Sequence, residues 1–438
     1  MSESMFAVGH EGGAAPTATQ PLKVGVLVDL TLSAGAGGHV KCWQRIAEAA
    51  VDYPDRLDLT VHFSGPEPRR IELSPSVRYR LLPPVFSTAR LIRELPDHTD
   101  LAPWHPRLAR ALPAYDLIHT TDAFFCYART ATRFGRRHGV PVVSSIHTNT
   151  PEYARITTAK LLERLLGRGL AYHAANDTLA LPGCVKGLLE RRLDRHLNRV
   201  AAAMESYGGE FDARYRSRHC GVALRRGLDR ALFSPERRDR AWLDARFGLP
   251  AGQLIALYAG KLNAGKNVPL LAPIIAAARR AGVPVHLFCA GSGAERGMLE
   301  AALGPALTCA GTLSQDELAR AYASADLFLF PSAIDEAGNA AVEALASGLP
   351  ALLAAGSGVA TRFADCPGLR VLPGDDPAPW AAAIGELAAR PRRRAKMSQA
   401  ARATVAARVP SWGEVLTEDL LPVWQAAAQR RVAQQRAA

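Results

Sequence analysis

The sequence predicts an α/β protein built from two doubly wound, Rossmann-like domains that face each other across a cleft. Its 438 residues exceed the usual length of one domain, and 48% of them are hydrophobic, enough to fill two cores. Short apolar runs alternate with segments of helical periodicity in both halves, which is typical of parallel sheets covered by helices. A charged stretch at residues 230–252, rich in proline and glycine, predicts the connection between the domains.

The first domain is predicted over residues 22–235, after a tail at residues 1–21 that is rich in glycine, alanine and threonine. The run LKVGVLVDL at residues 22–30 is apolar almost throughout, as expected of a strand buried on both faces of a sheet. A glycine-rich turn and a helical pattern follow and complete one βα unit. Further strands are expected at residues 59–63, 117–119 and 140–146.

The second domain, predicted over residues 236–410, repeats this pattern. Its apolar runs are separated by helix-period segments such as SQDELARAYASA. Residues 411–438 predict a terminal helix with a polar tail. Because ligands of such folds bind at the carboxyl ends of the strands, the active site is expected in the cleft between the sheets. The expected strands of this domain are residues 254–259, 285–290, 307–310, 327–330 and 351–354.

Cysteine content and hydropathy argue against several classes of protein. The seven cysteines are scattered and form no Cys-x-x-Cys pair, which argues against a disulfide framework and against a structural zinc site. A reducing, cytoplasmic compartment is therefore expected. No apolar run approaches the ~18 residues that a membrane span needs, and the N-terminus lacks the basic and hydrophobic segments of a signal peptide.

The formal charge is +12, and most of the excess lies in residues 101–235, with 21 Lys and Arg against 11 Asp and Glu. Such a region attracts nucleic acid, anionic lipid or an acidic small molecule, although solvated arginines are an equally simple explanation. Residues 155–200 contain two basic amphipathic stretches, which predict either a packed helix pair or peripheral contact with an anionic membrane. No nucleic-acid-binding module is visible, so no nucleic-acid partner is expected.

Two glycine-containing turns imitate nucleotide-binding motifs. Gly260-x4-Gly265-Lys266 has the spacing of a P-loop, but Asn267 stands where the Mg²⁺-binding Ser or Thr is needed. What remains is a pair of cations, Lys261 and Lys266, at the carboxyl end of a strand, where anionic ligands bind. The segment FCAGSGAERGMLE has the wrong glycine spacing for a dinucleotide fingerprint, so neither nicotinamide nor flavin binding is expected.

The segment PSAIDEAGNAAVEALASGLP is the most informative part of the chain. A strand ends before Pro331, a loop containing Asp335 follows, and an alanine-rich helix is expected to begin near Asn339, with Glu343 one turn inside it. The amides and dipole of that helix end would attract a phosphate, and the two carboxylates could accept hydrogen bonds from sugar hydroxyls. Capping of a surface helix by acidic residues is the alternative.

These residues resemble the family-4 retaining glycosyltransferases of the GT-B fold, the glycosyl transferases of group 1. The family signature PS-x-x-E-x-FG-x4-EA-x-A-x-G-x-P is similar to the segment above, with Asp335 in place of the first glutamate and Ala337 in place of an aromatic residue. AGKLNAGKNVPLL resembles the family's GR-x4-K-(N/G)-x3-L, with Lys261 at the arginine position. ALRRGLDRALFSP and SSIHTNTPEYA resemble two further family segments, so the similarity covers residue 22 to about 405.

The resemblance implies a role for each matched residue. Glu343 would bind the ribose hydroxyls of a nucleotide, Asp335 would face the transferred sugar, and His147 would contact that sugar near its reacting carbon. Lys261 and Lys266 would neutralise the diphosphate. Backbone groups would approach the phosphates from both domains, at Gly37, Gly38, Gly338, Asn339 and Ala340.

The departing nucleoside diphosphate can be stabilised by a divalent metal or by fixed cations and a helix N-terminus. The sequence has no Asp-x-Asp pair beside the nucleotide site, so a metal-independent hexosyltransferase without a cofactor is expected. Its donor would be a UDP- or GDP-linked sugar, and its acceptor a lipid-linked molecule or a glycan precursor. The regional positive charge favours an anionic, lipid-linked acceptor. The alternatives are a GT-B-like epimerase or phosphorylase, and a basic nucleic-acid-binding or sugar-nucleotide-binding protein without transfer activity.

Overall fold

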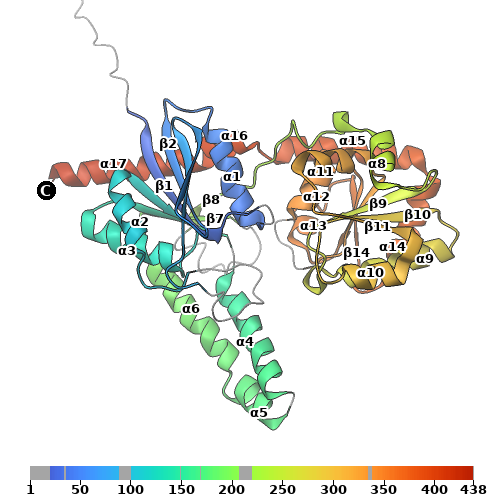
Figure 1. Ribbon diagram of the computed structural model, residues 1–438, viewed down its shortest axis with the longest axis horizontal. Coiled ribbons are helices and arrows are strands. Elements are labelled where there is room, and N and C mark those ends of the chain that lie inside the picture. Colours follow the sequence, from blue (N-terminus) through green and yellow to red (C-terminus); the bar gives the residue numbers. More distant parts are fainter. Residues whose placement is uncertain are drawn as a thin grey trace, which may run out of the picture.

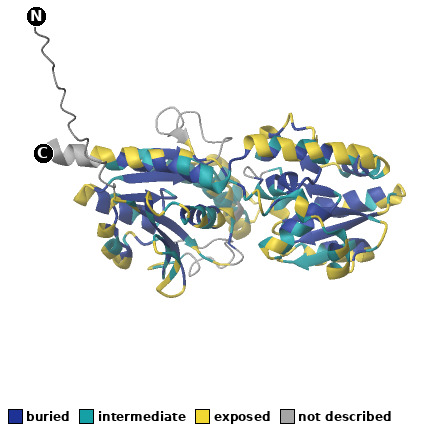
Figure 2. Ribbon diagram, turned by 90° about the horizontal axis from the view of Figure 1, so that it is seen from above, coloured by how far each residue is buried: buried dark blue, intermediate teal, exposed yellow. Residues whose placement is uncertain are grey.

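The computed structural model describes residues 20–33, 36–87, 100–147, 149–167, 169–206, 220–333 and 338–437. It contains two α/β domains that lie side by side, each with its own parallel sheet, as Figure 1 shows. The predicted fold class is therefore confirmed. Most strands of both sheets are buried, whereas the outer sides of the helices are exposed (Figure 2).

The first sheet has eight strands in the order β3-β4-β2-β1-β5-β6-β7-β8 within the described residues. Neighbouring strands are parallel except for β3 and β4, which are antiparallel. The strands are β1 (Leu22–Thr31), β2 (Leu57–Ser64), β3 (Arg69–Ser74), β4 (Val77–Leu82), β5 (Leu117–Thr120), β6 (Val142–Ile146), β7 (Ala202–Glu205) and β8 (Cys220–Ala223).

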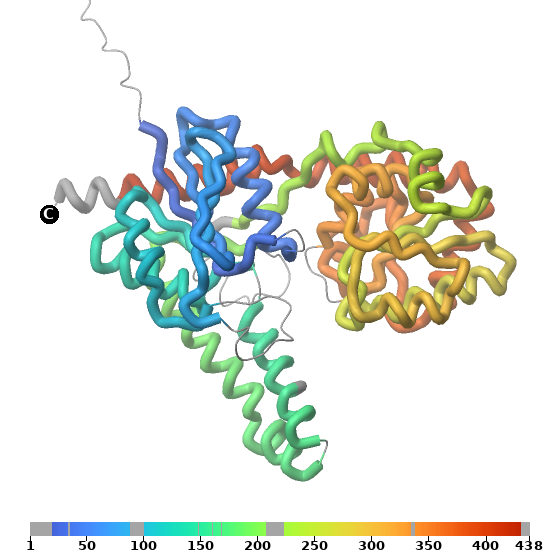
Figure 3. Tube along the Cα trace, viewed as in Figure 1, coloured from blue at the N-terminus to red at the C-terminus, as the bar shows by residue number. Residues whose placement is uncertain are grey.

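Helices cover both faces of this sheet. α1 (Gly38–Ala50) shares one hydrophobic core with β1 and β2, while α3 (Cys126–His138) packs against the opposite face beside α2 (Pro106–Ala111). A helical hairpin formed by α4 (Thr150–Leu166), α5 (Leu170–His173) and α6 (Leu181–Leu197) projects away from the domain (Figure 3). An ion pair of 2.7 Å between Lys186 Nζ and a Glu152 oxygen joins its two long helices.

The second sheet has six parallel strands in the order β11-β10-β9-β12-β13-β14. Its strands are β9 (Leu254–Ala259), β10 (Val285–Ala290), β11 (Leu307–Gly311), β12 (Leu327–Phe330), β13 (Ala351–Ala354) and β14 (Leu369–Leu372). The helices around it are α8 (Arg240–Phe247), α9 (Leu271–Arg280), α10 (Arg296–Leu303), α11 (Gln315–Ser324), α12 (Asn339–Ala346), α13 (Gly358–Arg362), α14 (Pro377–Ala389) and α15 (Pro391–Arg408).

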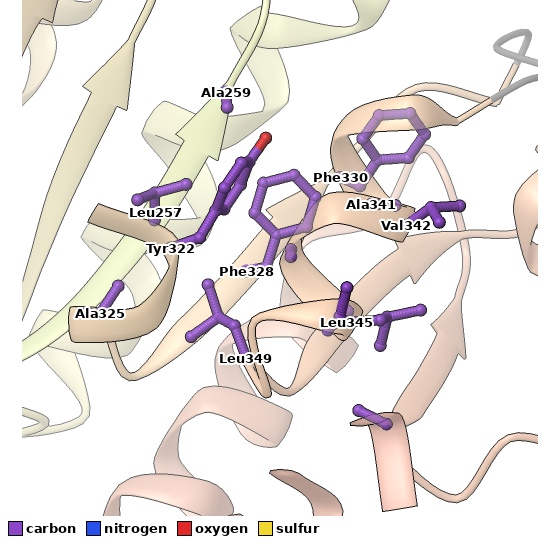
Figure 4. Close-up of a cluster of buried hydrophobic side chains, with 14 of the residues drawn as sticks. Leu257, Ala259, Tyr322, Ala325, Phe328, Phe330, Ala341, Val342, Leu345 and Leu349 are labelled. Carbon is purple, nitrogen blue, oxygen red and sulfur yellow. The ribbon is translucent and has the colours of Figure 1, made fainter. Parts of the chain in front are cut away.

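Successive side chains along the strands of this sheet point alternately into two cores, one on each face. This explains why the strand sequences are apolar without interruption. On β9, Leu257 and Ala259 join a cluster with α11 and α12, drawn in Figure 4, whereas Ala256 and Tyr258 join a second cluster with α9 and α14. Both faces of the strand are therefore buried.

The chain passes between the domains twice. Leu224 belongs to the core of the first domain and Leu228 to that of the second, so the first passage lies between them. The second follows α15, where α16 (Trp412–Glu414) leads through a π-helical turn into α17 (Leu421–Ala437). These last helices pack on the first domain, and Trp424 is buried in its core. Figure 3 shows this terminal segment in red, running back over the first domain.

All nine strands expected from the sequence are present, with boundaries shifted by three residues at most. The strands β3, β4, β7, β8 and β14 were not predicted. β3 and β4 alternate charged with apolar residues at the edge of the sheet, and β7, β8 and β14 have only four residues each. Among the described helices, none combines the length and the apolar composition needed to cross a membrane.

Candidate active site

Two helix N-termini, one from each domain, lie close together where the domains meet. α1 begins at Gly38 after an extended Gly37, and α12 begins at Asn339 after Gly338. The Asn339 Nδ2 atom lies 3.1 Å from the position that a Cβ atom on Gly38 would take. Neither Gly37 nor Gly338 carries a side chain that could cap the helix that follows it. The arrangement suits an anion.

Gly338 is required at its position for two reasons. Its φ angle is +55°, in the left-handed region that side chains disfavour, and a Cβ atom there would lie 2.4 Å from the Cβ atom of Val359 in α13. The close approach of α13 therefore holds the start of α12 in place. Ala340, the second helical residue, is partly buried and packs on the core of the second domain.

Glu343 lies in the second turn of α12 and is partly buried. Its Oε2 atom accepts a hydrogen bond of 3.3 Å from the hydroxyl of Tyr322, a buried residue of α11. Burial raises the pKa of Glu343 to about 7, although the positive charges of Lys41 and Arg45 oppose this shift. Since both cations belong to α1, the carboxyl group of Glu343 interacts electrostatically with the first domain. Arg45 also donates a hydrogen bond of 3.0 Å to Gln315 of the second domain.

Lys261 and Lys266 lie in the loop after β9, at the carboxyl edge of the second sheet. Asn267, the residue that breaks the P-loop pattern, has a structural task. It adopts φ +53°, and its Nδ2 atom donates to the backbone oxygens of Gly374 and Pro331, at 2.6 and 3.3 Å. The lysine loop is thereby tied to the end of β12, which leads toward α12.

The glycines after β10 also support this loop. A Cβ atom on Gly291 would lie 1.9 Å from the Gly260 oxygen, and one on Gly293 would lie 2.2 Å from the Leu262 oxygen. Any side chain at either position would collide with backbone. These glycines therefore pack one loop against the other and position Lys261, with no need for a dinucleotide.

His147 directly follows β6 and is buried. One ring nitrogen, Nε2, lies 2.8 Å from Ser145 Oγ, and Nδ1 lies 3.4 Å from an Arg226 NH2 group. Because a guanidinium only donates, Nδ1 is the acceptor, and neutral His147 carries its proton on Nε2. Burial and the charges of His39 and Arg226 hold the pKa of His147 well below its ordinary value, so the ring is neutral.

His39 and Arg226 are site residues that the sequence analysis did not identify. The ring of His39, in the first turn of α1, stacks on His147 with 4.2 Å between centroids. Arg226 is buried in the first passage between the domains, and its charge lowers the pKa of Arg362 in α13, after the larger effect of burial. Arg226 belongs to the segment ALRRGLDRALFSP quoted above, which gave a signal for the segment but not for a charge in the cleft.

The structure thus brings Gly37, Gly38, Gly338, Asn339 and Glu343 to the meeting of the two domains. His147 stands in a neighbouring cluster that shares α1. Asp335 lies outside the described residues. Among the residues that are described, no group of three His, Cys, Asp or Glu side chains could hold a metal ion.

Comparison with known proteins adds the family. The model of the glycosyl transferases group 1 matches residues 253–390. D-inositol 3-phosphate glycosyltransferase of Nocardiopsis dassonvillei is 29% identical, over 82% of this chain and 82% of that protein. Among solved structures, sucrose-phosphate synthase from Thermosynechococcus elongatus has a TM-score of 0.60 at 19% identity, covering 95% of this chain and 98% of that one. HepE from Anabaena, in complex with UDP and glucose, has a TM-score of 0.60 at 15% identity, covering 95% and 100%.

The family match falls on the domain that contains Glu343 and both lysines, and the relative matches most of the chain. The solved structures share both domains and their arrangement as a fold. Together, the family match, the relative and the two parallel-sheet domains support a GT-B-fold glycosyltransferase of group 1.

Proposed function

We propose that this glycosyltransferase moves a hexose from a nucleoside-diphosphate sugar to an anionic acceptor, with retention of the anomeric configuration and without a metal ion. The observation that carries the proposal is the approach of α1 and α12, with Asn339 Nδ2 3.1 Å from a Cβ position on Gly38. Two helix N-termini, one from each domain and each preceded by a glycine, would form a binding site for a diphosphate that both domains share.

The nucleoside would bind beside α12. Glu343 would accept hydrogen bonds from both ribose hydroxyls, in the presence of the Tyr322 hydroxyl that already donates to it. We assign uridine as the base, with guanosine as the alternative, because HepE shares the fold and is described in complex with UDP. The 29% identical relative does not identify the base.

Charge that develops on the leaving diphosphate would be stabilised by the two helix N-termini and by Lys261, Lys266 and Arg226. Arg226 is buried at the domain boundary, where a guanidinium acts in a low dielectric. Such fixed donors need no reorganisation during the reaction and can replace a metal ion. Asp335 would then face the sugar that is transferred.

His147 would contact the sugar through its Nδ1 edge. The bond from Arg226 to this atom is long, at 3.4 Å, and therefore weak. When a diphosphate draws Arg226 toward itself, Nδ1 becomes free to accept from a sugar hydroxyl. His147 would thus position the sugar only when the leaving group is in place.

The acceptor would be a phosphorylated molecule. The relative is named for D-inositol 3-phosphate, and the first domain here carries the positive excess of residues 101–235. The hairpin would bring the protein to an anionic membrane surface, where lipid-linked acceptors are found. Residues 150–199 hold nine Lys and Arg against five Asp and Glu, and leucines near the tip are exposed.

The test is a transfer assay with UDP-glucose and GDP-mannose as donors, inositol 3-phosphate as acceptor, and release of the nucleoside diphosphate as readout. We expect release from the UDP sugar that depends on the acceptor and continues in EDTA. An α-configured product from these α-linked donors would establish retention. Complete inhibition by EDTA that Mn²⁺ reverses would contradict the metal-free site, and release without an acceptor product would favour another reaction.

A further inference from the structure

A second cationic site lies between α3 and α6, outside the cleft. It is a cavity of about 570 Å³, within the size range of small-molecule sites. His196 and Thr132 contribute to its lining, and arginines dominate the rest. We call it the arginine groove, and its six arginines are Arg129, Arg133, Arg136, Arg192, Arg195 and Arg199.

The arginines form two rows at helical spacing. Arg129, Arg133 and Arg136 follow one another at steps of four and three residues along α3, so they share one face of that helix. Arg192, Arg195 and Arg199 follow at steps of three and four, along α6 and just beyond its end. α3 ends before β6 and α6 ends before β7, which are neighbouring parallel strands, so the two helices end at the same edge of the sheet. Both rows line the same cavity.

Within the residues that the structure describes, none of the six arginines is within ion-pair distance of an Asp or Glu oxygen. Asp122 acts on Arg192 electrostatically, but its Oδ1 atom is occupied by the amides of Phe124 and Phe125, at 2.7 and 2.8 Å. Burial lowers the pKa of Arg192, and the charges of Arg129 and Arg195 lower it further. Asp122 opposes the charge of only Arg129 and Arg192, so positive charge is in excess along the lining of the groove.

Part of the groove is already ordered for binding. Arg129 Nε donates to the Phe124 oxygen at 2.9 Å, and its NH1 group donates to the Leu101 oxygen at 2.8 Å. The Arg133 guanidinium lies over the Trp104 ring, 5.8 Å from its centroid. Side chains held in this way lose less conformational freedom when a ligand arrives than free arginines do.

The groove is separated from the active site by the sheet itself. Ser144 and Ser145 are consecutive on β6, so their side chains point to opposite faces. Ser144 Oγ lies 3.0 Å from His196 Nε2, on the groove side, whereas Ser145 Oγ contacts His147. A ligand in the groove would therefore bind apart from the donor.

We propose that the arginine groove binds a ligand that carries two or more clustered phosphate groups. Guanidinium groups match phosphate oxygens with paired hydrogen bonds, and two facing rows suit phosphates on both sides of one ligand. The ligand is either a free polyphosphorylated molecule or a phospholipid headgroup, and the experiment below separates these sources. The site does not depend on the proposed donor or acceptor, so it stands or falls separately from them.

The test compares two double variants with equal loss of charge. Arg136→Gln with Arg195→Gln removes one exposed arginine from each row. Arg137→Gln with Arg191→Gln is the matched control, since these exposed neighbours lie on the same helices but do not line the groove. One arm titrates inorganic tripolyphosphate by calorimetry with excess UDP present to fill the donor site. The other uses phosphatidylcholine vesicles with and without phosphatidic acid, whose phosphate groups lie side by side at the vesicle surface.

We expect the groove variant to bind one of these probes about tenfold more weakly than the control variant, a difference of about 1.4 kcal/mol. Weaker binding of tripolyphosphate by the groove variant identifies a soluble ligand. Weaker binding only to the phosphatidic acid vesicles identifies a lipid headgroup. Equal affinity of the two variants for both probes overturns the proposal. Binding of duplex DNA with the same arginine dependence, without binding of either probe, overturns it in favour of a nucleic-acid site.

Discussion

Glu343 shows how a single carboxyl group can report on both domains. It belongs to α12, its hydrogen-bond donor Tyr322 belongs to α11, and the cations that act on it belong to α1. Burial favours its protonated form, while the cations of the first domain favour its charged form. Its pKa of about 7 therefore places its titration near neutral pH, where a ribose-binding carboxylate must be ionised.

The Glu343→Gln substitution tests this role. At pH 8 the variant should bind free UDP about tenfold more weakly than the wild type, since one charge-assisted hydrogen bond contributes roughly 1.5 kcal/mol. At pH 6 the difference should narrow, because most wild-type molecules then carry the protonated carboxyl. Calorimetry at pH 6, 7 and 8 measures both effects, with the exposed Glu67→Gln as the control.

The same residue predicts a pH dependence of folding. Its folded pKa lies above the ordinary value of 4.5, so the unfolded chain gives up this proton first. The carboxyl group therefore costs stability increasingly as the pH rises from about 4.5 to about 7. The melting temperature of Glu343→Gln, measured relative to that of the wild type, should therefore rise as the pH increases over that range. A difference that does not change with pH would contradict the burial of this group.

Candidate site residues could be proposed from the sequence where a local motif existed. The glycines before α1 and α12, and Glu343 itself, could be placed because their spacing is fixed by one turn and one helix. His39 and Arg226 could not, since their meeting with His147 joins three separate segments. A histidine stack and a cation from a linker leave no periodic signal in the chain.

Among the elements, the hairpin differs most from its surroundings. Nine of the twelve large apolar side chains that are exposed in the described residues lie within residues 150–197. Near its tip, Leu165, Leu170 and Leu179 are 70%, 91% and 62% exposed. An exposed apolar group of this size on a monomeric domain marks an interaction surface. Its position at a projecting end suits a lipid surface better than a groove.

The tip can be tested by changing Leu165, Leu170 and Leu179 to Ser together. Each leucine contributes up to roughly 1.5–3 kcal/mol when fully buried, so even partial insertion of three predicts at least a tenfold loss of vesicle binding. Co-sedimentation with anionic vesicles measures this. The control is Val85→Ser, an exposed apolar position outside the hairpin. Equal sedimentation of the triple variant and the wild type would contradict insertion of the tip into lipid and would favour another partner for this surface.

Strands were predictable wherever both faces are buried, because such strands are apolar at every position. The run at residues 254–259 is buried throughout and was found with its observed boundaries. The edge strand β3, with the sequence RRIELS, is exposed or half-buried along its whole length and gave no such signal. The basic stretches within residues 155–200 are helical, as predicted. That the helices project from the domain depends on tertiary packing, which the periodicity of a sequence does not reveal.

For the whole molecule, the terminal helix makes the first domain dependent on the end of the chain. Leu416, Leu420 and Trp424 are fully buried in the core that also contains Trp43 of α1. Trp424 Nε1 donates a hydrogen bond of 2.9 Å to His119 Nδ1, which lies 305 positions away in sequence. No local pattern could have revealed this contact.

The Trp424→Ala substitution should destabilise the first domain and spare the second. Loss of a buried tryptophan costs about 3–5 kcal/mol, and the hydrogen bond to His119 is lost with it. Hydrogen exchange should accelerate in β1 and β5 while β9 and β12 keep their protection. Gln425→Ala, an exposed change on the same helix, serves as the control. Uniform acceleration in both domains would show that the two unfold as one unit instead.

The return of α17 to the first domain also sets an order of events during synthesis. The first domain emerges from the ribosome before the second, yet roughly 190 residues separate Leu224 from Val415, or about 10–40 s of translation. Until then, the terminal helices cannot cover the part of the first domain's core that they contact at α1, β5 and β6. The second domain, whose core is complete by residue 409, can therefore finish folding earlier. The domain that is made first is therefore completed last. Until synthesis ends, its uncovered apolar surface is open to contact with other chains.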